Sequence, residues 1–144
     1  MDIDTASKTI EQKLSNDWTL TPVVFENIPA KDLGAEGQPD LYAGTVSFIE
    51  IEVSPGFSRP ITVPLGCIRY TGFMTAAVMC PRYTGSRESD SIVSALSKML
   101  EFQQLCAGSE CLRFKELSVA ARSIVKDAWV RTTVQLAFEF NRER

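Results

Sequence analysis

Paired carboxylates are the residues of this chain whose spacing comes closest to a chemical site. Glu50 and Glu52 lie in the segment 45–53, where apolar and polar residues alternate as in a half-buried strand, so both carboxylates share one face. Such a pair suits a divalent cation or general acid catalysis, and its ordinary interpretation is a solvated strand face. We favour a third interpretation, an acidic strip that meets a basic strip on a neighbouring subunit. Arg69 and Arg131 lie on other polar strand faces and are the candidates for that basic strip.

Other catalytic chemistries find little support in the residues. The chain has no histidine, which excludes Ser-His-Asp and Cys-His catalysis within it, whereas a Ser-Lys or Cys-Asp pair stays possible without a motif that points to one. Neither type of glycine-rich phosphate loop occurs, and 83–86 is best interpreted as an ordinary turn and helix cap. The sequence therefore predicts no enzyme, no cofactor and no metal.

The four cysteines do not form a zinc motif, because no CxxC occurs and histidine is absent. Cys106 and Cys111 are five positions apart and could meet in space. The chain lacks the basic start and apolar stretch of a signal peptide, so we expect it to stay in the cytosol. We therefore predict that all four cysteines are reduced.

Composition points to one globular domain spanning 1–144. Hydrophobic residues make up 44% and charged residues 23% of the 144 positions, a balance that supports a packed core. The net charge is −3 without a Lys/Arg block, so a broad nucleic-acid footprint is not expected. No apolar run reaches the length of a spanning helix.

Hydrophobic periodicity predicts an α+β fold, a mostly antiparallel sheet packed by two helices. Period-3.6 stripes mark the helices, and period-2 alternation or β-branched and aromatic runs mark the strands. The predicted order is α-β-β-β-α-β-β, with helices at 4–18 and 89–105 and strands at 23–26, 45–53, 68–80, 112–119 and 129–140. Two long connections, 28–44 and 55–66, interrupt this order, and the second could be a hairpin tip or an arm. Four aromatic residues fall on outward faces or in connections, where they mark an interface or pack under a helix: Tyr42, Phe57, Phe73 and Trp129.

One stretch of the chain resembles the tail terminator family of long-tailed bacteriophages. The resemblance is a strand with Arg and Gly, a Pro-x-x-x-Gly turn, and a helix with Ala and apolar residues that ends near Phe. The residues that carry it are Arg69, Gly72, Val78, Pro81-Arg82-Tyr83-Thr84-Gly85, Ile92, Ala95, Leu96 and Phe102. The preceding amphipathic helix and the strand at 129–140 also match the order of elements in that family.

The resemblance implies a ring, usually of six subunits, on the head-proximal end of the tail tube. Such a ring ends tube growth and presents a surface for head joining, and DNA passes through it. The expected partners are other copies of the chain, the tail tube protein and the head–tail connector protein, with no membrane involved. The chain would be made in the host cytoplasm and reside in the tail or neck of the virion.

A cyclic ring uses two different patches on each subunit. The Glu50/Glu52 strip and the Arg69/Arg131 faces are the predicted patches, and the long connections are predicted to contact tube or connector through Lys31, Asp32, Phe57 and Arg59. Two alternatives stay open. One is a connector or other neck protein, and the other is a small cytosolic enzyme or ligand-binding domain, whose marker would be a deep pocket with converging polar groups.

Overall fold

The computed structural model describes residues 1–25, 47–60, 67–81, 86–125 and 129–143. Along the chain these residues form α1 (Ile3–Asp17), β1 (Val23–Phe25), β2 (Phe48–Pro60), β3 (Cys67–Pro81), α2 (Ser86–Leu100), β4 (Gln104–Ala107), β5 (Glu110–Val125) and β6 (Trp129–Glu143). The predicted order of helices and strands is confirmed except for β4, a short strand in the part of the chain assigned to the end of the second helix. No helix among these described elements is long and apolar enough to cross a membrane.

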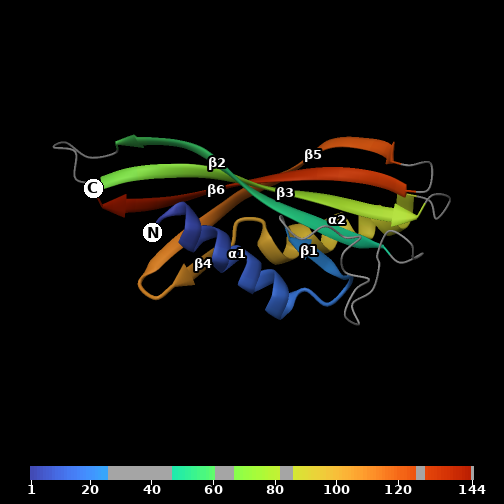
Figure 1. Cartoon of the computed structure of the whole chain (residues 1–144), viewed down its shortest axis with the longest axis horizontal. Helices are drawn as coiled ribbons and strands as arrows, with labels where there is room; N and C mark the ends of the chain where they lie inside the picture. Colours follow the sequence, from blue (N-terminus) through green and yellow to red (C-terminus); the bar gives the residue numbers. More distant parts are fainter. Residues whose placement is uncertain (26–46, 61–66, 82–85, 126–128, 144) are drawn as a thin grey trace.

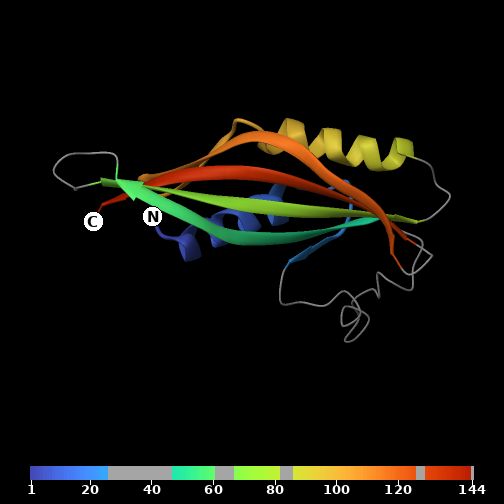
Figure 2. The same ribbon diagram turned by 90° about the horizontal axis from the view of Figure 1, so that it is seen from above.

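The strands form a single mixed sheet in the order β1-β2-β3-β6-β5-β4. Short β1 pairs parallel with β2, and every other neighbouring pair is antiparallel. The sheet is strongly twisted and curved, and α1 and α2 lie on the same side of it (Figures 1 and 2). The sheet therefore has an inner face packed by helices and an outer face on which no described helix lies.

Apolar stripes hold both helices on the inner face. Ala6, Ile10 and Leu14 of α1 are fully buried, and α2 contributes Ile92, Leu96 and Leu100 to the same core. At the start of α1 the Asp2 carboxylate accepts a hydrogen bond from the Thr5 backbone N–H at 2.8 Å. This bond stabilises the charged form and lowers the pKa of Asp2. The stripes predicted from the sequence are thus the buried surfaces of both helices.

The central strands contribute the other half of this core, because apolar and polar residues alternate along them and the apolar ones face the helices. The register places Ile51 beside Ala76 and Ala76 beside Val134, all buried beneath the helices. Their neighbours in sequence, which include Glu50 and Glu52, point to the outer face. The predicted division of inward and outward residues in β2, β3 and β6 is confirmed.

A buried aromatic ring covers a glycine in the middle of the sheet. Gly72 of β3 lies directly opposite Phe138 of β6, and the Phe138 ring is fully buried. A Cβ atom on Gly72 would lie 2.6 Å from Cζ of that ring, so only glycine leaves room for it. Phe138 also contacts Phe114 edge-on and stacks on Phe140 at centroid distances of 6.0 and 6.3 Å. The core at this end of the sheet depends on Phe138.

The segment 55–66, predicted as a long excursion, is strand over most of its first half. β2 continues to Pro60 and pairs with β3 throughout, with a bulge between Ser54 and Phe57. At the bulge, a Cβ atom on Gly56 would lie 1.8 Å from the Thr71 carbonyl oxygen. The bulge absorbs the extra residues and lets pairing continue, so β2 and β3 extend together as an arm. The sequence predicted a strand end here because Pro55 is typical of one. The alternation of apolar and polar residues does not indicate the bulge that accommodates Pro55 within β2.

A disulfide corrects the prediction that all four cysteines are reduced. Cys106 and Cys111 are directly opposite each other in the β4–β5 hairpin and are joined by an S–S bond. Their separation of five positions permits this pairing only once β4 exists as a strand, and the sequence did not reveal β4. Among the other cysteines, Cys80 is a buried free thiol.

We expect the disulfide to contribute about 2 kcal/mol to the free energy of unfolding, through loop closure in the unfolded chain. Urea denaturation of the oxidised protein should give a stability higher by that amount than the Cys106→Ser/Cys111→Ser variant. Reductant should lower the wild type to the level of the variant and leave the variant unchanged. Equal stability of oxidised and reduced wild type would show that the bond does not form in solution.

A second, smaller apolar cluster lies on the outer face at the end of the sheet opposite the arm. Trp129 is only 3% exposed and packs edge-on against the fully buried Phe48 at a centroid distance of 5.4 Å. Of the four aromatic residues singled out in the sequence, Trp129 is therefore packed, Phe73 is half-buried and Phe57 is 59% exposed. Tyr42 lies outside the described residues.

Candidate functional site: the outer face of the sheet

The four residues predicted to form subunit contacts all lie on strands of the outer face, but they do not form two strips. Arg69 of β3 is opposite Asn141 of β6, whereas Arg131 of β6 is opposite Met79 of β3. Asn141 and Arg131 are ten residues apart on one strand, which corresponds to roughly 33 Å. The prediction that Arg69 and Arg131 share one basic strip is therefore geometrically wrong.

Arg131 instead lies near the acidic residues. Glu50 is opposite Ala77, which is opposite Thr133, two positions from Arg131 along β6. The Arg131 Nε atom is buried and makes no hydrogen bond to the described part of the chain. Glu52 lies two residues nearer the arm along β2 than Glu50, and its side chain is exposed. Arg131 therefore lies at the same end of the outer face as Glu50.

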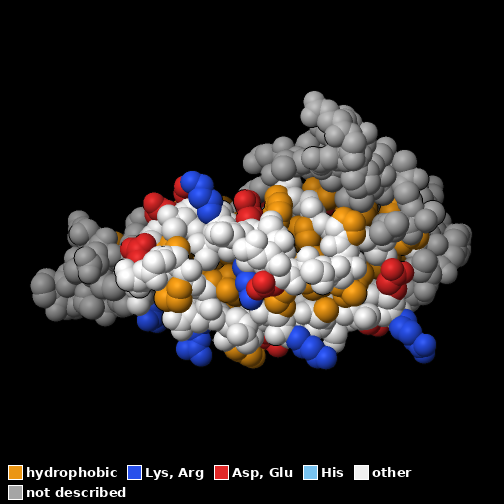
Figure 3. All heavy atoms as spheres, turned by 90° about the horizontal axis from the view of Figure 1, so that it is seen from below, with side chains coloured by type: hydrophobic (Ala, Val, Ile, Leu, Met, Phe, Trp, Pro, Cys, Tyr) orange, Lys and Arg blue, Asp and Glu red, His pale blue; other side chains and the backbone are white. Residues whose placement is uncertain are grey.

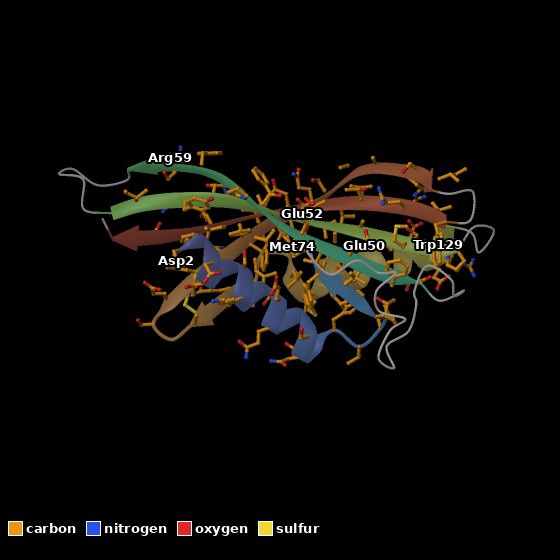
Figure 4. All side chains as sticks on the ribbon, viewed as in Figure 1. Asp2, Glu50, Glu52, Arg59, Met74 and Trp129 are labelled. Atoms are coloured by element: carbon orange, nitrogen blue, oxygen red, sulfur yellow. A yellow bond between two sulfur atoms is a disulfide. The ribbon has the colours of Figure 1, made fainter. Side chains whose placement is uncertain are left out.

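The opposite end of the outer face is basic. Arg59 of β2 is directly opposite Arg69 of β3, and Arg113 of β5 is directly opposite Glu139 of β6. Lys115 Nζ lies 3.5 Å from Glu139 Oε2, so the single carboxylate among these side chains is already paired. Figure 4 shows Arg59 at the far end of the sheet from Glu50 and Trp129, with Glu52 between. Basic residues therefore predominate at the arm end and Glu50 and Glu52 lie away from it, while Glu139 at the arm end and Arg131 near Glu50 depart from this division.

A shallow pocket of about 200 Å³ lies within this basic end. Its polar lining comes from four different strands: Arg69, Gln104, Arg113, Glu139 and Asn141. Arg69 Nε donates a hydrogen bond to Asn141 Oδ1 at 3.3 Å, which fixes the plane of the guanidinium. Cys111 of the disulfide also lines the pocket, so the β4–β5 hairpin helps to shape it.

Arg113 was missed by the sequence reasoning, although its signal is present. Leu112 and Phe114 are both fully buried, and period-2 alternation through them places Arg113 and Lys115 on the opposite face. The predicted strand at 112–119 already contained this pattern. What the sequence lacked was the pairing of β5 with β6, which brings Arg113 to the same end of the sheet as Arg69.

Two of the four residues predicted to contact the tube or connector belong to the same surface. Phe57 is opposite Thr71 and Arg59 is opposite Arg69, so both lie on the outer face of the arm, and both are exposed. Lys31 and Asp32 lie outside the described residues. The arm and the basic end thus form one continuous surface.

Polar side chains also gather where α2 begins, and their contacts stabilise the packing of this helix on the sheet. Ser89 Oγ and Thr132 Oγ1 are 2.8 Å apart and buried, and Arg122 bonds to both Thr132 and Asp90. Nearby, burial raises the pKa of the Cys80 thiol and so favours its protonated form. These contacts tie α2 to β5 and β6.

A second open pocket, about 400 Å³, lies on the helical side between the end of α1 and the start of α2. Figure 3 shows apolar side chains reaching the surface in patches on this side of the molecule. The carboxylate in its lining, Glu88, already accepts a hydrogen bond from Ser47 Oγ at 2.7 Å. The described residues contain no cluster of three potential metal ligands. The polar part of this lining consists of Thr21, Arg87, Glu88 and Ser91.

Comparison with known proteins supports the fold alone. No protein-family model matches the chain, and no curated protein matches it. Several solved structures are similar to it, and one of them is similar over 97% of this chain and 96% of its own, with a TM-score of 0.68 and 18% sequence identity. At this level of identity, the likeness shows that the arrangement of strands and helices occurs in another protein.

Proposed function

We propose that this chain is a structural protein of virion assembly that forms a ring, most simply a hexamer, on the head-proximal end of a phage tail tube. The observation that carries the proposal is the outer face of the sheet. It bears no described helix, and Arg59, Arg69, Arg113 and Lys115 gather at the arm end, away from Glu50 and Glu52. Such a face offers two different, complementary patches on each copy.

Two different patches are what a cyclic assembly requires, because the contact from one subunit to the next is heterologous. Electrostatic complementarity sets register and selects partners more than it sets affinity. In the proposed ring, the Glu52 region of one copy meets the Arg59/Arg69 end of the next. The exposed Phe57, which lies on the arm beside the basic end, supplies an apolar contact of the kind enriched in interface centres.

The resemblance of the β3–α2 region to tail terminators supplies the partner in this proposal. In the proposed assembly the ring seats on the last ring of tube subunits and prevents further addition, while its other side receives the head connector. Tube-stopping requires binding to one end of a polymer and no turnover of a substrate.

The test is a polymerisation assay with purified tail tube protein. Adding the chain at substoichiometric amounts should shorten the tubes in proportion to its concentration and label one tube end in electron micrographs. Tubes of unchanged length, with the chain bound instead to DNA-filled heads, would favour a connector. Unchanged tubes without binding to either structure would contradict the proposal.

A further inference from the structure

We propose that the pocket at the basic end of the outer face is a carboxylate-binding site, and that it receives the Glu52 side chain of a neighbouring copy. The inference rests on the proposed self-association and deepens it by naming the side chains that meet. The site consists of Arg69, Arg113, Gln104 and Asn141.

The pocket presents hydrogen-bond donors suited to a carboxylate. Arginine offers a planar fork of N–H groups that matches both carboxylate oxygens, and the bond from Arg69 Nε to Asn141 Oδ1 leaves the other N–H groups of that fork for a ligand. Gln104 is directly opposite Arg113 across the β4–β5 pair, so their side chains adjoin. A volume of about 200 Å³ accommodates a carboxylate with its adjoining methylene groups.

Glu139 also lines the pocket and opposes an incoming anion. Its carboxylate lies 3.5 Å from Lys115 Nζ and is paired with that cation, and Glu139 is also opposite Arg113 in the register. Three described cations, Arg69, Arg113 and Lys115, thus surround one carboxylate, that of Glu139. The pocket therefore keeps an excess of positive charge.

Glu52 cannot reach this pocket within its own chain. Glu52 is opposite Thr75, and Thr75 is six residues from Arg69 along β3, which corresponds to roughly 20 Å. An extended glutamate and an extended arginine together fall short of that separation once both point out of the sheet. The exposed Glu52 carboxylate and this pocket can therefore meet only between copies.

Charge reversal followed by charge exchange tests the pairing. We expect Arg113→Glu and Glu52→Arg each to weaken the self-association constant by about 10- to 100-fold, since each reversal places like charges against each other at the contact. The double variant Glu52→Arg/Arg113→Glu should return to within about threefold of the wild type. Arg87→Glu, a reversal at an exposed position of α2, is the matched control and should leave association unchanged.

A zero-length cross-link locates the contact directly. In Arg113→Lys, which keeps the positive charge, carbodiimide should join the Glu52 carboxylate of one copy to the introduced amine at position 113 of another. Mixing ¹⁴N- and ¹⁵N-labelled protein and identifying the mixed-isotope peptide pair by mass spectrometry would prove that the link is between copies. Circular dichroism of every variant should match the wild type, because none of the changed side chains is in the core.

Failure of this inference is distinguishable from failure of the proposed function. Intact association in both single variants, with no cross-link from Glu52 to position 113, would overturn the carboxylate site while leaving ring formation standing. Strong binding of inorganic phosphate at Arg113 by NMR, without rescue by the charge exchange, would assign the pocket to another anion and also overturn it. A chain that stays monomeric alone and on tube ends would overturn both.

Discussion

Replacing Phe138 with alanine should lower the free energy of unfolding by about 3–5 kcal/mol, the cost of truncating a fully buried aromatic residue. Phe138 is central to the aromatic contacts that join β5 to β6, and its ring covers Gly72 on β3. Urea denaturation monitored by circular dichroism measures the loss. An effect below about 1 kcal/mol would mean that the ring is not packed where the structure places it.

The same contact predicts a strong coupling with Gly72. Gly72→Ala should cost about 1–3 kcal/mol in the wild type, because the new Cβ atom would overlap the Phe138 ring and force it to move. In the Phe138→Ala background the ring is gone, so Gly72→Ala should then be nearly neutral. A double-mutant cycle gives the coupling, and additive effects would contradict the ring-over-glycine arrangement.

Replacing Gly56 with asparagine should cost about 1–3 kcal/mol and disrupt the arm, because any Cβ there meets the Thr71 carbonyl oxygen at 1.8 Å. The obstacle is backbone, which cannot swing aside as a side chain can. Hydrogen exchange should show loss of protection in β2 beyond Ser54 and in the facing part of β3. Protection in β5 and at the centre of β6 should persist.

Gly108 provides the matched control for that substitution. Gly108 has a φ of +66°, and no atom lies within 4 Å of where its Cβ would be. Glycine is therefore favoured there by the backbone conformation and not by a lack of room for a side chain. Asparagine adopts this left-handed region more readily than other non-glycine residues, so Gly108→Asn should cost only a few tenths of a kcal/mol. A comparable loss at both positions would argue against the steric account of the Gly56 bulge.

Hydrophobic alternation was sufficient to predict which residues of β2, β3 and β6 face the core. Ile51, Met74 and Leu136 are buried where period 2 places them, because each strand is long and covered on one face. The helical stripes through Ile10 and Leu96 were equally clear. These patterns depend only on local sequence and burial, so they required no knowledge of pairing.

The features that the sequence did not reveal depend on pairing and register. The separation of Arg69 from Arg131 follows from the offset between β3 and β6, and no single-strand pattern encodes that offset. Short β4 is recognisable only as the partner of β5, and with it the Cys106–Cys111 bond. Pro55 and Gly56 are typical loop residues, so the sequence predicted a connection where β2 in fact continues into the arm. The bulge between Ser54 and Phe57 accommodates both residues. The basic pocket was not predicted either, because its lining residues come from four strands that only the pairing brings together.

The most direct test of the account is the mass of the purified protein in solution, measured by light scattering at low and high concentration and paired with negative-stain images. The account predicts closed rings of about six 16.0 kDa subunits that become populated as concentration rises. It also predicts that the rings dissociate when salt is added, because exposed charge pairs are screened. A strict monomer under all of these conditions, which also fails to bind the ends of purified tail tubes, would contradict it.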